Sequence, residues 1–532
     1  MPAGASNDTL AIPGAVLTMD DQTLRYRTYT LQKPLQPGDS IRLAYSADFV
    51  NRGIENEVSF TQITRNGSFF HDNDILPVIG YSSREELTNT LDRRKYKLPQ
   101  RQRLARLSRI CTDTCNTSYI NKSATWVDLT TTISTSDDQI AIAPGSLVRQ
   151  WHENGRNYYT YQLHHQALNF FSFLAADYLV KRDSIDHVAI EIYYDKHHPF
   201  NVDRMVSAVK KSLHYYTTNF GPYYQQECRI IEFPRYAGFA QAFPGTMPYS
   251  ESVGFINDLR DTSTLDLVTY VVSHEMGHQW WAHQVIGPAM QGSESFSEGL
   301  AQYSALMVMK KEYGPQKMSR FLKYELDAYL RGRGQEKEYE NPLMRTEGQA
   351  YIHYSKASLV YYYLQEMIGE QQLDAILKKI VTKYAYTNPP FPTAFNIVDE
   401  LKAGTPDSLS YLISDMFENI TLFNNSVDSA TVTKIADHRF QVKMKLLCEK
   451  IRCDSLGNEH QVPINDYIDV GIFERNRQDG SLLGNSLMSE RIKIHGDTTL
   501  TFIVSKWPYQ VGVDPYHYLI DKVTEDNLKI VF

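Results

Sequence analysis

The stretch from His274 to Tyr303 reads HEMGHQWWAHQVIGPAMQGSESFSEGLAQY and joins two segments with helical periodicity. In the first segment His274 and His278 are four residues apart, so on a helix their imidazoles lie on one face about one turn apart. Two imidazole nitrogens placed in this way suit a zinc ion. Glu275 lies beside them without being a ligand, which is the usual place of the general base in zinc hydrolases with the pattern His-Glu-x-x-His.

These three polar side chains fall in a helix that is otherwise apolar. Apolar residues recur at helical spacing along TLDLVTYVVSHEMGHQWWAHQV (residues 264–285), and polar residues at 262–264 precede them. An exposed helix with incidental histidines is the alternative interpretation, but buried polar groups without partners are costly. A shared metal ion supplies such a partner. His283 lies further along and is interpreted as a structural or neighbouring histidine rather than as a fourth ligand.

A third ligand has to come from another part of the stretch. A catalytic zinc usually has three protein ligands and keeps a position for water, whereas structural sites normally close all four positions, which disfavours a purely structural zinc. Glu294 and Glu298 are the candidates, and they are themselves four residues apart, so helical geometry does not choose between them. The helix that carries Glu298 is expected to span residues 297–314, with Ser295 and Glu298 in a capping-box arrangement.

The rest of the chain has the composition of a globular protein with several domains. Its 532 residues exceed the size at which one core keeps growing, so two to four domains are expected. A hydrophobic content of 42% with 22% charged residues argues against wholesale disorder, and a net charge of −8 argues against nucleic acid as the main partner. The longest apolar stretch, residues 167–180, is too short to span a bilayer, and no signal-peptide pattern opens the sequence.

The five cysteines form two local pairs, Cys111 with Cys115 and Cys448 with Cys453, and a single residue, Cys228. The first pair lacks the nearby histidines or further cysteines that would complete a zinc site. Each pair either closes a small disulfide in an oxidising compartment or stays reduced, and the sequence leaves both alternatives open.

The periodicity predicts an α+β fold with several domains. Short alternating segments favour a β domain over residues 1–186, within which the basic run 93–109 is interpreted as a solvated connecting helix. Helical spacing then dominates residues 187–426, where strands at its start are followed by long helices. Alternation returns over residues 427–532 and predicts a closing β-sandwich.

The combination HEMGH…SEGLAQY resembles the gluzincin metallopeptidases of the membrane-alanyl-aminopeptidase family, whose third zinc ligand lies in a motif of the type N-E-G-F-A. The resemblance implies that Glu298 is that ligand. NFGPYY (residues 219–224) and YIHYSKASLVYYYLQEMIGE (residues 351–370) are also similar to family segments, and the second implies that Tyr354 stabilises the oxyanion. The family fold implies an N-terminal β-sandwich or saddle domain, a thermolysin-like catalytic domain and a C-terminal β-sandwich.

Two local features depart from that family pattern. Nineteen residues separate His278 from Glu298, one more than the family has, so the linking loop has to absorb an insertion. Ser297 stands where the family has an asparagine before the third ligand.

The third departure concerns the family's G-A-M-E-N exopeptidase motif, which is missing. The equivalent segment is GFAQAFPGTMPYSE (residues 238–251), in which Ala242, preceded by Gln241, replaces the glutamate that holds the free amino terminus of a substrate. A cationic amine needs an anionic partner in a partly desolvated site. Glu251 is an alternative partner, although a structural role is the preferred interpretation.

The sequence therefore predicts a zinc peptidase with one Zn²⁺ per chain and a peptide substrate. The wording of FAQAFPGTMPYSE and SHEMGHQWWAHQV is most similar to a bacterial subgroup in which the peptidase region follows an ABC-type permease, so association with a membrane permease region is expected from the resemblance. The alternative is a zinc-retaining module that binds peptides for a transporter without cleaving them, an interpretation prompted by the missing glutamate.

Overall fold

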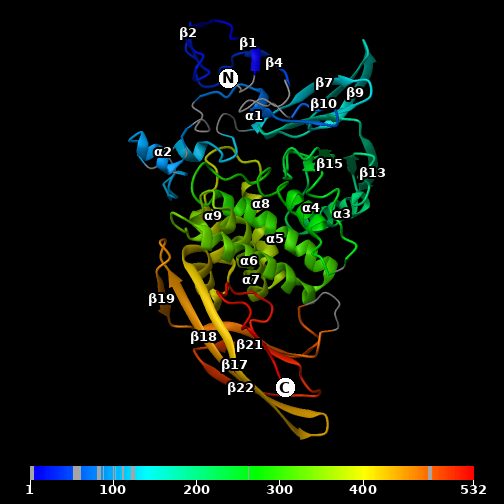
Figure 1. Ribbon diagram of the computed structural model, residues 1–532. Coiled ribbons are helices and arrows are strands. Elements are labelled where there is room, and N and C mark those ends of the chain that lie inside the picture. Colours follow the sequence, from blue (N-terminus) through cyan, green and yellow to red (C-terminus); the bar gives the residue numbers. More distant parts are fainter. Residues whose placement is uncertain are drawn as a thin grey trace. The chain divides into compact units, whose positions relative to one another are not determined.

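The computed structural model describes residues 5–51, 62–80, 86–87, 89–99, 101, 103–110, 113–121, 126–261, 263–476 and 482–531. The chain divides into two compact units. The first unit comprises residues 1–102, 120–206 and 224–257, and the second comprises residues 103–119, 207–223 and 258–532. The element order is β-rich, then helical, then β-rich, which confirms the predicted fold class (Figure 1). The domain boundaries at residues 186 and 426 stay a prediction.

Short strands, mostly in antiparallel sheets, build most of the first unit. The sheets pair β1 with β4, β2 with β3 and β11 with β6, and two three-stranded sheets have the orders β7-β10-β9 and β5-β12-β8. The strands are β1 (Ala5–Ala11), β2 (Ala15–Asp21), β3 (Tyr26–Leu31), β4 (Ala44–Phe49), β5 (Ser68–His71), β6 (Trp126–Val127), β7 (Thr130–Ser136), β8 (Ile140–Ile142), β9 (Ser146–Glu153), β10 (Arg156–Gln162), β11 (Ala167–Leu168) and β12 (Ser172–Ala176). Two short helices, α1 (Asp72–Ile75) and α2 (Thr90–Lys95), interrupt them.

A further, four-stranded sheet of the first unit has the strand order β13-β14-β15-β16. Its strands are β13 (Leu179–Ile185), β14 (Val188–Tyr194), β15 (Glu227–Phe233) and β16 (Thr246–Ser250). β14, β15 and β16 run parallel, whereas β13 is antiparallel to β14. Every residue of β15 is buried, as expected for a central strand covered on both faces. The three parallel strands therefore end at the same edge of the sheet.

Helices form the central part of the second unit. They are α4 (Leu267–Gly277), α5 (Ser293–Tyr313), α6 (Met318–Gln335), α7 (Ala357–Ile368), α8 (Glu370–Tyr384), α9 (Ala394–Gly404) and α10 (Tyr411–Ile413). The boundary between the two units falls within α3 (Val202–Asn219). α5 is buried along most of its length, including Leu300, Leu306 and Met309. It is the central helix against which α4 and α7 pack.

Two sheets with a shared core close the second unit. One contains β17 (Ile420–Ala436), β18 (Arg439–Cys453), β19 (Glu459–Val462) and β22 (Thr498–Val504), and the other has the order β21 (Ser486–Ile494), β20 (Asp466–Phe473), β23 (Gln510–Val513) and β24 (Leu528–Ile530). Alternate residues of β18, such as Val442, Met444 and Leu446, are buried, because successive side chains of a strand point to opposite faces. They share a cluster with Val470 and Ile472 of β20, which makes this part a β-sandwich.

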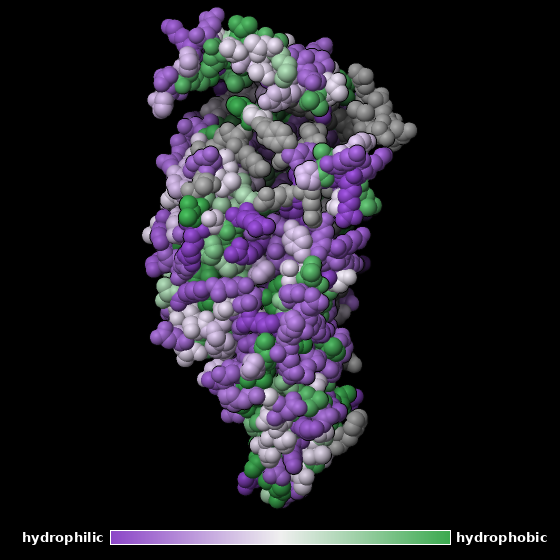
Figure 2. All heavy atoms as spheres, turned by 90° about the vertical axis from the view of Figure 1, so that its left-hand side faces the viewer, coloured by the Kyte–Doolittle hydropathy of each residue, from purple (hydrophilic) through white to green (hydrophobic). Residues whose placement is uncertain are grey.

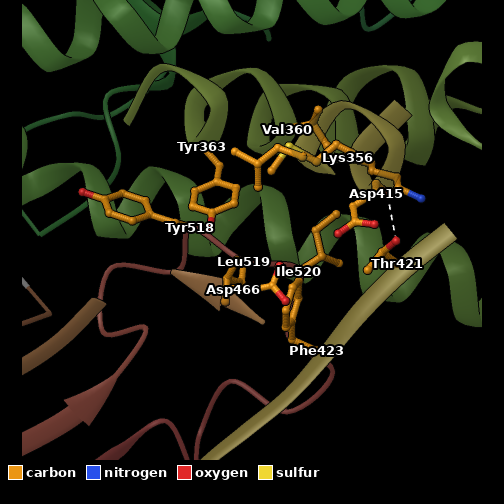
Figure 3. Close-up of a pocket in the computed structure, with 12 residues that line it drawn as sticks. Lys356, Val360, Tyr363, Asp415, Thr421, Phe423, Asp466, Tyr518, Leu519 and Ile520 are labelled. Carbon is orange, nitrogen blue, oxygen red and sulfur yellow. Dashed lines mark hydrogen bonds between the residues drawn. The ribbon is translucent and has the colours of Figure 1, made fainter. Parts of the chain in front are cut away.

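The junction between α7 and the sandwich encloses a cavity of about 30 Å³, room for about one water molecule (Figure 3). Its wall includes the carboxylates of Asp415 and Asp466, and Thr421 donates a hydrogen bond to the backbone carbonyl of Asp415 at 2.8 Å. The buried Lys450 ammonium donates to both carboxylates, at 2.9 Å to Oδ1 of Asp466. The negative charge of this cavity is therefore already compensated.

One sequence-based expectation about the periphery needs correction, and one alternative that the sequence left open, the state of Cys448 and Cys453, is decided. The basic run 93–109 is not one helix, since α2 ends at Lys95 before Pro99. Cys448 and Cys453 are free thiols, and so is Cys228. Cys111 lies outside the described residues.

The face of the molecule drawn in Figure 2 is mixed in polarity. On the face drawn in Figure 2, hydrophilic residues are interspersed with smaller groups of apolar ones. Within the described ranges, none of the helices has the combination of length and apolarity needed to cross a bilayer.

Candidate active site

The candidate site begins at the C-terminal end of α4. Asp266 caps the helix, because its Oδ1 accepts a hydrogen bond from the backbone N–H of Thr269 at 3.0 Å. Asp266, rather than one of the polar residues that precede residue 265 in the sequence, is therefore the cap. The helix ends at Gly277 instead of continuing to residue 285, and His278 is its C-cap residue, still with right-handed helical φ and ψ. His274 and His278 are each 8% exposed, so both imidazoles are held in the interior.

Three atoms of these helices form a compact triangle. Nε2 of His274 and Nε2 of His278 are 3.0 Å apart, and Oε2 of Glu298 lies 3.4 Å from the first and 3.0 Å from the second. Four ligands arranged tetrahedrally at roughly 2.05 Å from a zinc ion are about 3.3 Å from one another, so the triangle has the size that zinc requires. Within the described part of the chain, His274, His278 and Glu298 form the metal-ligating group of the second unit.

Polar atoms around the triangle lack other partners. Among the described residues Oε2 of Glu298 and Nδ1 of His274 are buried without a hydrogen bond. Although burial by itself raises the pKa of Glu298, the neighbouring imidazoles of His278 and His274 hold it well below its usual range. A buried carboxylate that stays ionised beside two imidazole nitrogens fits a cation that all three side chains would share. The residues present therefore fit a zinc ion.

The orientation of His278 is fixed from its other ring nitrogen. Nδ1 lies 3.0 Å from the carbonyl oxygen of Trp281, so a proton on Nδ1 is donated there and the lone pair of Nε2 would be available to a metal ion. The same carbonyl accepts a hydrogen bond from Ser297 at 3.0 Å, and Tyr119 donates to the hydroxyl of Ser297. Ser297, which stands where the resemblance expects asparagine, thus ties the start of α5 to the loop after α4.

Two glycines allow the helices of the site to approach closely. A Cβ at Gly277 of α4 would lie 3.0 Å from Cα of Ala301 on α5. A Cβ at Gly299, next to Glu298, would lie 2.6 Å from Cβ of Ala357 at the start of α7. Real Cβ atoms do not approach so closely, so only glycine fits at Gly299 without a shift of the helices. The two contacts hold α5 against both neighbours at the level of the triangle.

α5 itself begins earlier than expected. It starts at Ser293 after Gly292, and the hydroxyl of Ser295 donates to the carbonyl of Gly292 at 2.7 Å, so the predicted capping box of Ser295 and Glu298 is wrong. Glu294 and Glu298 are one turn apart on α5, but their carboxylates contact different residues. Oε2 of Glu294 lies 3.3 Å from Nδ1 of His353 and accepts a hydrogen bond from the backbone of Gly348, so Glu294 is not part of the triangle.

Tyr354 lies on a π-helical segment, Tyr351–Lys356, that leads directly into α7. A π turn contains one residue more than an α turn, so it redirects the side chains that it carries, and such turns are frequent at functional sites. The Tyr354 ring centroid is 5.7 Å from that of His274. Burial, followed by the charges of Glu298 and Glu275, raises the pKa of the Tyr354 hydroxyl, which therefore stays protonated and able to donate a hydrogen bond.

A buried ion pair anchors this π-helical segment. Nζ of Lys356, which is 1% exposed, lies 3.3 Å from Oε1 of Glu340. The same carboxylate accepts hydrogen bonds from Tyr329 at 2.7 Å and from Arg333 at 2.8 Å. Because the anchor is two residues from Tyr354, it restricts where that tyrosine can lie.

Glu275 and His283 are also buried. Glu275 is 5% exposed and close enough for its charge to raise the pKa of both Tyr354 and His278. His283 does not belong to the metal-ligating group found among the described residues.

The segment expected to replace the exopeptidase motif lies in the first unit. Gln241 and Phe243 donate backbone hydrogen bonds to Pro248 and Thr246, so the segment folds back on β16 as a hairpin. Ala242 is buried in it.

Two residues near the triangle were not anticipated from the sequence. Tyr119 contacts Ser297, and the charges of Glu298 and Glu294 add to burial in raising its pKa. Glu325 on α6 is buried and accepts hydrogen bonds from Tyr270 at 2.7 Å and Gln302 at 2.8 Å. Tyr119 lies in an irregular segment without a motif, so no local signal marks it, whereas the helical periodicity of α6 places Glu325 on its buried face.

Comparison with known families gives this arrangement its context. Residues 204–416 match the peptidase family M1 domain. This part of the chain is similar to the peptidase domain of family M1. It contains α4, α5 and α7, and with them the triangle of His274, His278 and Glu298.

Individual relatives of the M1 domain are distant. Endoplasmic reticulum aminopeptidase 2 of Homo sapiens is 23% identical over 210 residues, which are 38% of this chain and 22% of that protein. The chain thus matches about a fifth of the length of this relative. A two-domain M1 zinc metallopeptidase variant solved with L-arginine has a TM-score of 0.52 at 14% identity, over 77% of this chain and 84% of that chain. Aminopeptidase A of Legionella pneumophila, solved with aspartic acid, has a TM-score of 0.48 at 14% identity, over 74% and 44% of the two chains. At 14% identity, the two-domain M1 structure supports the fold alone.

Proposed function

We propose that the chain is a zinc-dependent peptidase, with His274, His278 and Glu298 as the ligands of one zinc ion. The observation that carries the proposal is the triangle of ligand atoms, with sides of 3.0, 3.0 and 3.4 Å, buried inside the M1 domain. Three protein ligands would leave one position of the ion for solvent, as a catalytic zinc needs.

The neighbouring side chains have the properties that hydrolysis requires. When bound, zinc would lower the pKa of a water molecule and polarise the peptide carbonyl. Glu275 takes the proton of the attacking water and returns one to the leaving amine, because its carboxylate lies beside Tyr354 and His278. The protonated hydroxyl of Tyr354 donates a hydrogen bond to the oxyanion that develops on the carbonyl oxygen.

The proposed specificity is for the amino-terminal residue of peptides. The relative from Homo sapiens is named as an aminopeptidase, which supports this choice. The family's amine-binding glutamate is replaced by Ala242, so another carboxylate has to hold the cationic amine. Glu294 is a candidate within the second unit, because it lies one turn from Glu298 on α5 and is 21% exposed.

The interpretation as a transporter module that binds peptides without cleaving them gains no support from the matches reported above, which are to peptidases. Glu275 also argues against it, since a protein that only binds peptides has no need of a general base. Association with a membrane permease region remains a proposal that rests on the similarity of sequence.

Incubation of the zinc-loaded chain with a mixed peptide library, followed by mass spectrometry, tests the proposal. We expect products shortened by single residues at the N-terminus, and no cleavage of the same peptides after N-acetylation. Glu275→Gln should retain zinc and lose turnover, whereas Glu490→Gln, at an exposed position of β21, should retain both. Internal cuts would point to an endopeptidase, and equal turnover by Glu275→Gln would refute the general base.

A further inference from the structure

A second group of metal-binding side chains gathers at the edge where the parallel strands of the first unit end. His198 follows β14, Glu232 is the penultimate residue of β15, and Glu251 comes directly after β16. The register pairs Glu232 with Tyr249 and Phe233 with Ser250, so the ends of β15 and β16 are adjacent. Side chains that follow the carboxyl ends of parallel strands converge at one edge, which is where such sheets generally bind ligands.

The three side chains are close enough to share one ion. A ring nitrogen of His198 and one carboxylate oxygen each of Glu232 and Glu251 all lie within 4.8 Å of one another. In the present arrangement Nδ1 of His198 is in contact with Oε1 of Glu232. Metal binding would replace the proton in that contact, as is usual when an imidazole and a carboxylate become ligands.

These side chains also line a cavity of about 140 Å³, all of whose walls belong to the first unit. Since a water molecule occupies roughly 30 Å³ in the liquid, the cavity has room for an ion together with several waters. Its lining is mainly polar and includes Asp177, Asp195 and His197 besides the three side chains.

Glu232 is buried against the imidazole of His198. It is 4% exposed, and its Oε2 accepts a hydrogen bond from the backbone N–H of Asp195 at 2.7 Å. Within the described ranges neither Glu232 nor Glu251 forms an ion pair with a lysine or arginine. The carboxylates of Asp415 and Asp466 in the cavity of Figure 3, by contrast, share the ammonium group of Lys450. Among the described residues at this edge, an imidazole and two carboxylates therefore line a polar cavity without a lysine or arginine to pair with the carboxylates.

We infer that His198, Glu232 and Glu251 form a second divalent-metal site, located in the first unit and separate from the triangle of the M1 domain. One imidazole with two carboxylates suits Zn²⁺ or Mn²⁺, with water at the remaining positions, whereas Ca²⁺ and Mg²⁺ take oxygen ligands. The ion links the segments that follow β14, β15 and β16. Its role is therefore to hold the edge of this sheet together.

Metal stoichiometry on the full chain tests the site. After removal of metal with a chelator, the protein is titrated with Zn²⁺ alone, and in a second series with Mn²⁺ alone, and the bound metal is counted by mass spectrometry after gel filtration. We expect two equivalents of Zn²⁺ per wild-type chain. His198→Gln should bind one, and His187→Gln, at an exposed position before β14, should still bind two. The one equivalent of Zn²⁺ that His198→Gln still binds shows that the variant has folded.

Glu251→Gln provides a second variant at a partly exposed position, where a change threatens folding less. This variant should also bind one equivalent of Zn²⁺ fewer than the wild type. It should lack the increase in melting temperature that the second equivalent of Zn²⁺ produces in the wild type. A single equivalent in the wild type, or two equivalents in His198→Gln and Glu251→Gln, would overturn the inference. The result is independent of peptidase activity, because a chain without turnover can still be counted for metal.

Discussion

Oε2 of Glu298 lies 3.0 Å from Nε2 of His278, although nineteen residues separate them in the sequence. Neither atom is positioned by the intervening loop alone. The two helices that carry them are in contact at Gly277 and Ala301, and the carbonyl of Trp281 accepts a hydrogen bond from each side of the loop. The geometry of the proposed zinc site is therefore a property of packed helices, and substitutions can test it piece by piece.

Glu298→Gln should lose most of its zinc and its peptidase activity. An amide oxygen carries no charge, so it is a poorer zinc ligand than a carboxylate. Metal analysis of the purified variant measures the loss directly. Glu294→Gln is the matched control, because it makes the same change one turn earlier on α5 and should keep the zinc. Zinc loss in both variants would contradict the assignment of Glu298.

Tyr354→Phe should reduce kcat by about a hundredfold to a thousandfold and leave KM nearly unchanged, as expected when one oxyanion donor is lost. Steady-state kinetics on a fluorogenic peptide give both constants. Zinc content should not change. Tyr351→Phe, in the same π-helical segment but hydrogen bonded to Glu336, is the control and should keep kcat near the wild-type value. A large rise in KM for Tyr354→Phe would instead indicate a role in binding.

Gly299→Ala should destabilise the second unit by about 1–3 kcal/mol, the usual cost of overpacking, because the new methyl group would lie 2.6 Å from Cβ of Ala357. Denaturant unfolding of Gly299→Ala and of the control Gly334→Ala measures the change in the free energy of unfolding. Gly334→Ala on α6 meets no atom within 4 Å and should have the opposite sign, since alanine favours a helix over glycine by about 1 kcal/mol. Equal effects of the two substitutions would show that the close contact is not strained by a methyl group.

The carboxyl of Asp374 should make stability depend on pH. Burial raises its pKa to about 7, although a hydrogen bond from Tyr215 at 3.1 Å acts against this. The folded chain keeps this proton up to about pH 7, while the unfolded chain releases it near pH 4. The stability that depends on this group is therefore complete below about pH 4 and is lost as the pH rises through 7.

Asp374→Asn removes this titration, so its melting temperature should fall less than that of the wild type between pH 5 and pH 8. Scanning calorimetry at a series of pH values gives the comparison. Asp437→Asn, at a site where the side chain is 90% exposed, is the control and should follow the wild-type curve. Parallel curves for the wild type and Asp374→Asn would contradict the prediction.

Much of the fold follows from periodicity that is visible in the sequence. The change from alternation to helical spacing predicts the order of β, helical and β parts, because burial of one face imposes a period of two on strands and 3.6 on helices. The position of His274, Glu275 and His278 on one helix follows in the same way. The boundaries of the elements do not follow from periodicity. α4 ends at Gly277, which lies against Ala301 of α5.

The parts of the site that sequence reasoning missed depend on contacts between distant segments. Glu294 and Glu298 present the same helical face, and only the packing of α5 brings Glu298 to the imidazoles while Glu294 contacts His353. Tyr119 has no motif around it, yet it donates to Ser297. The π-helical turn at Tyr354 is invisible to periodicity, because a single extra residue changes the helical spacing too little to be recognised.

The close contacts at Gly277 and Gly299 offer a criterion for judging other sequences of this type. A homologue that retains the two histidines and the glutamate but has a larger residue at either glycine would keep the chemical groups and lose the spacing between them. Such a sequence is better interpreted as a degenerate copy than as an active enzyme. The ligand residues alone are therefore an incomplete signature of an active site of this type. Glycine at positions 277 and 299 completes the signature.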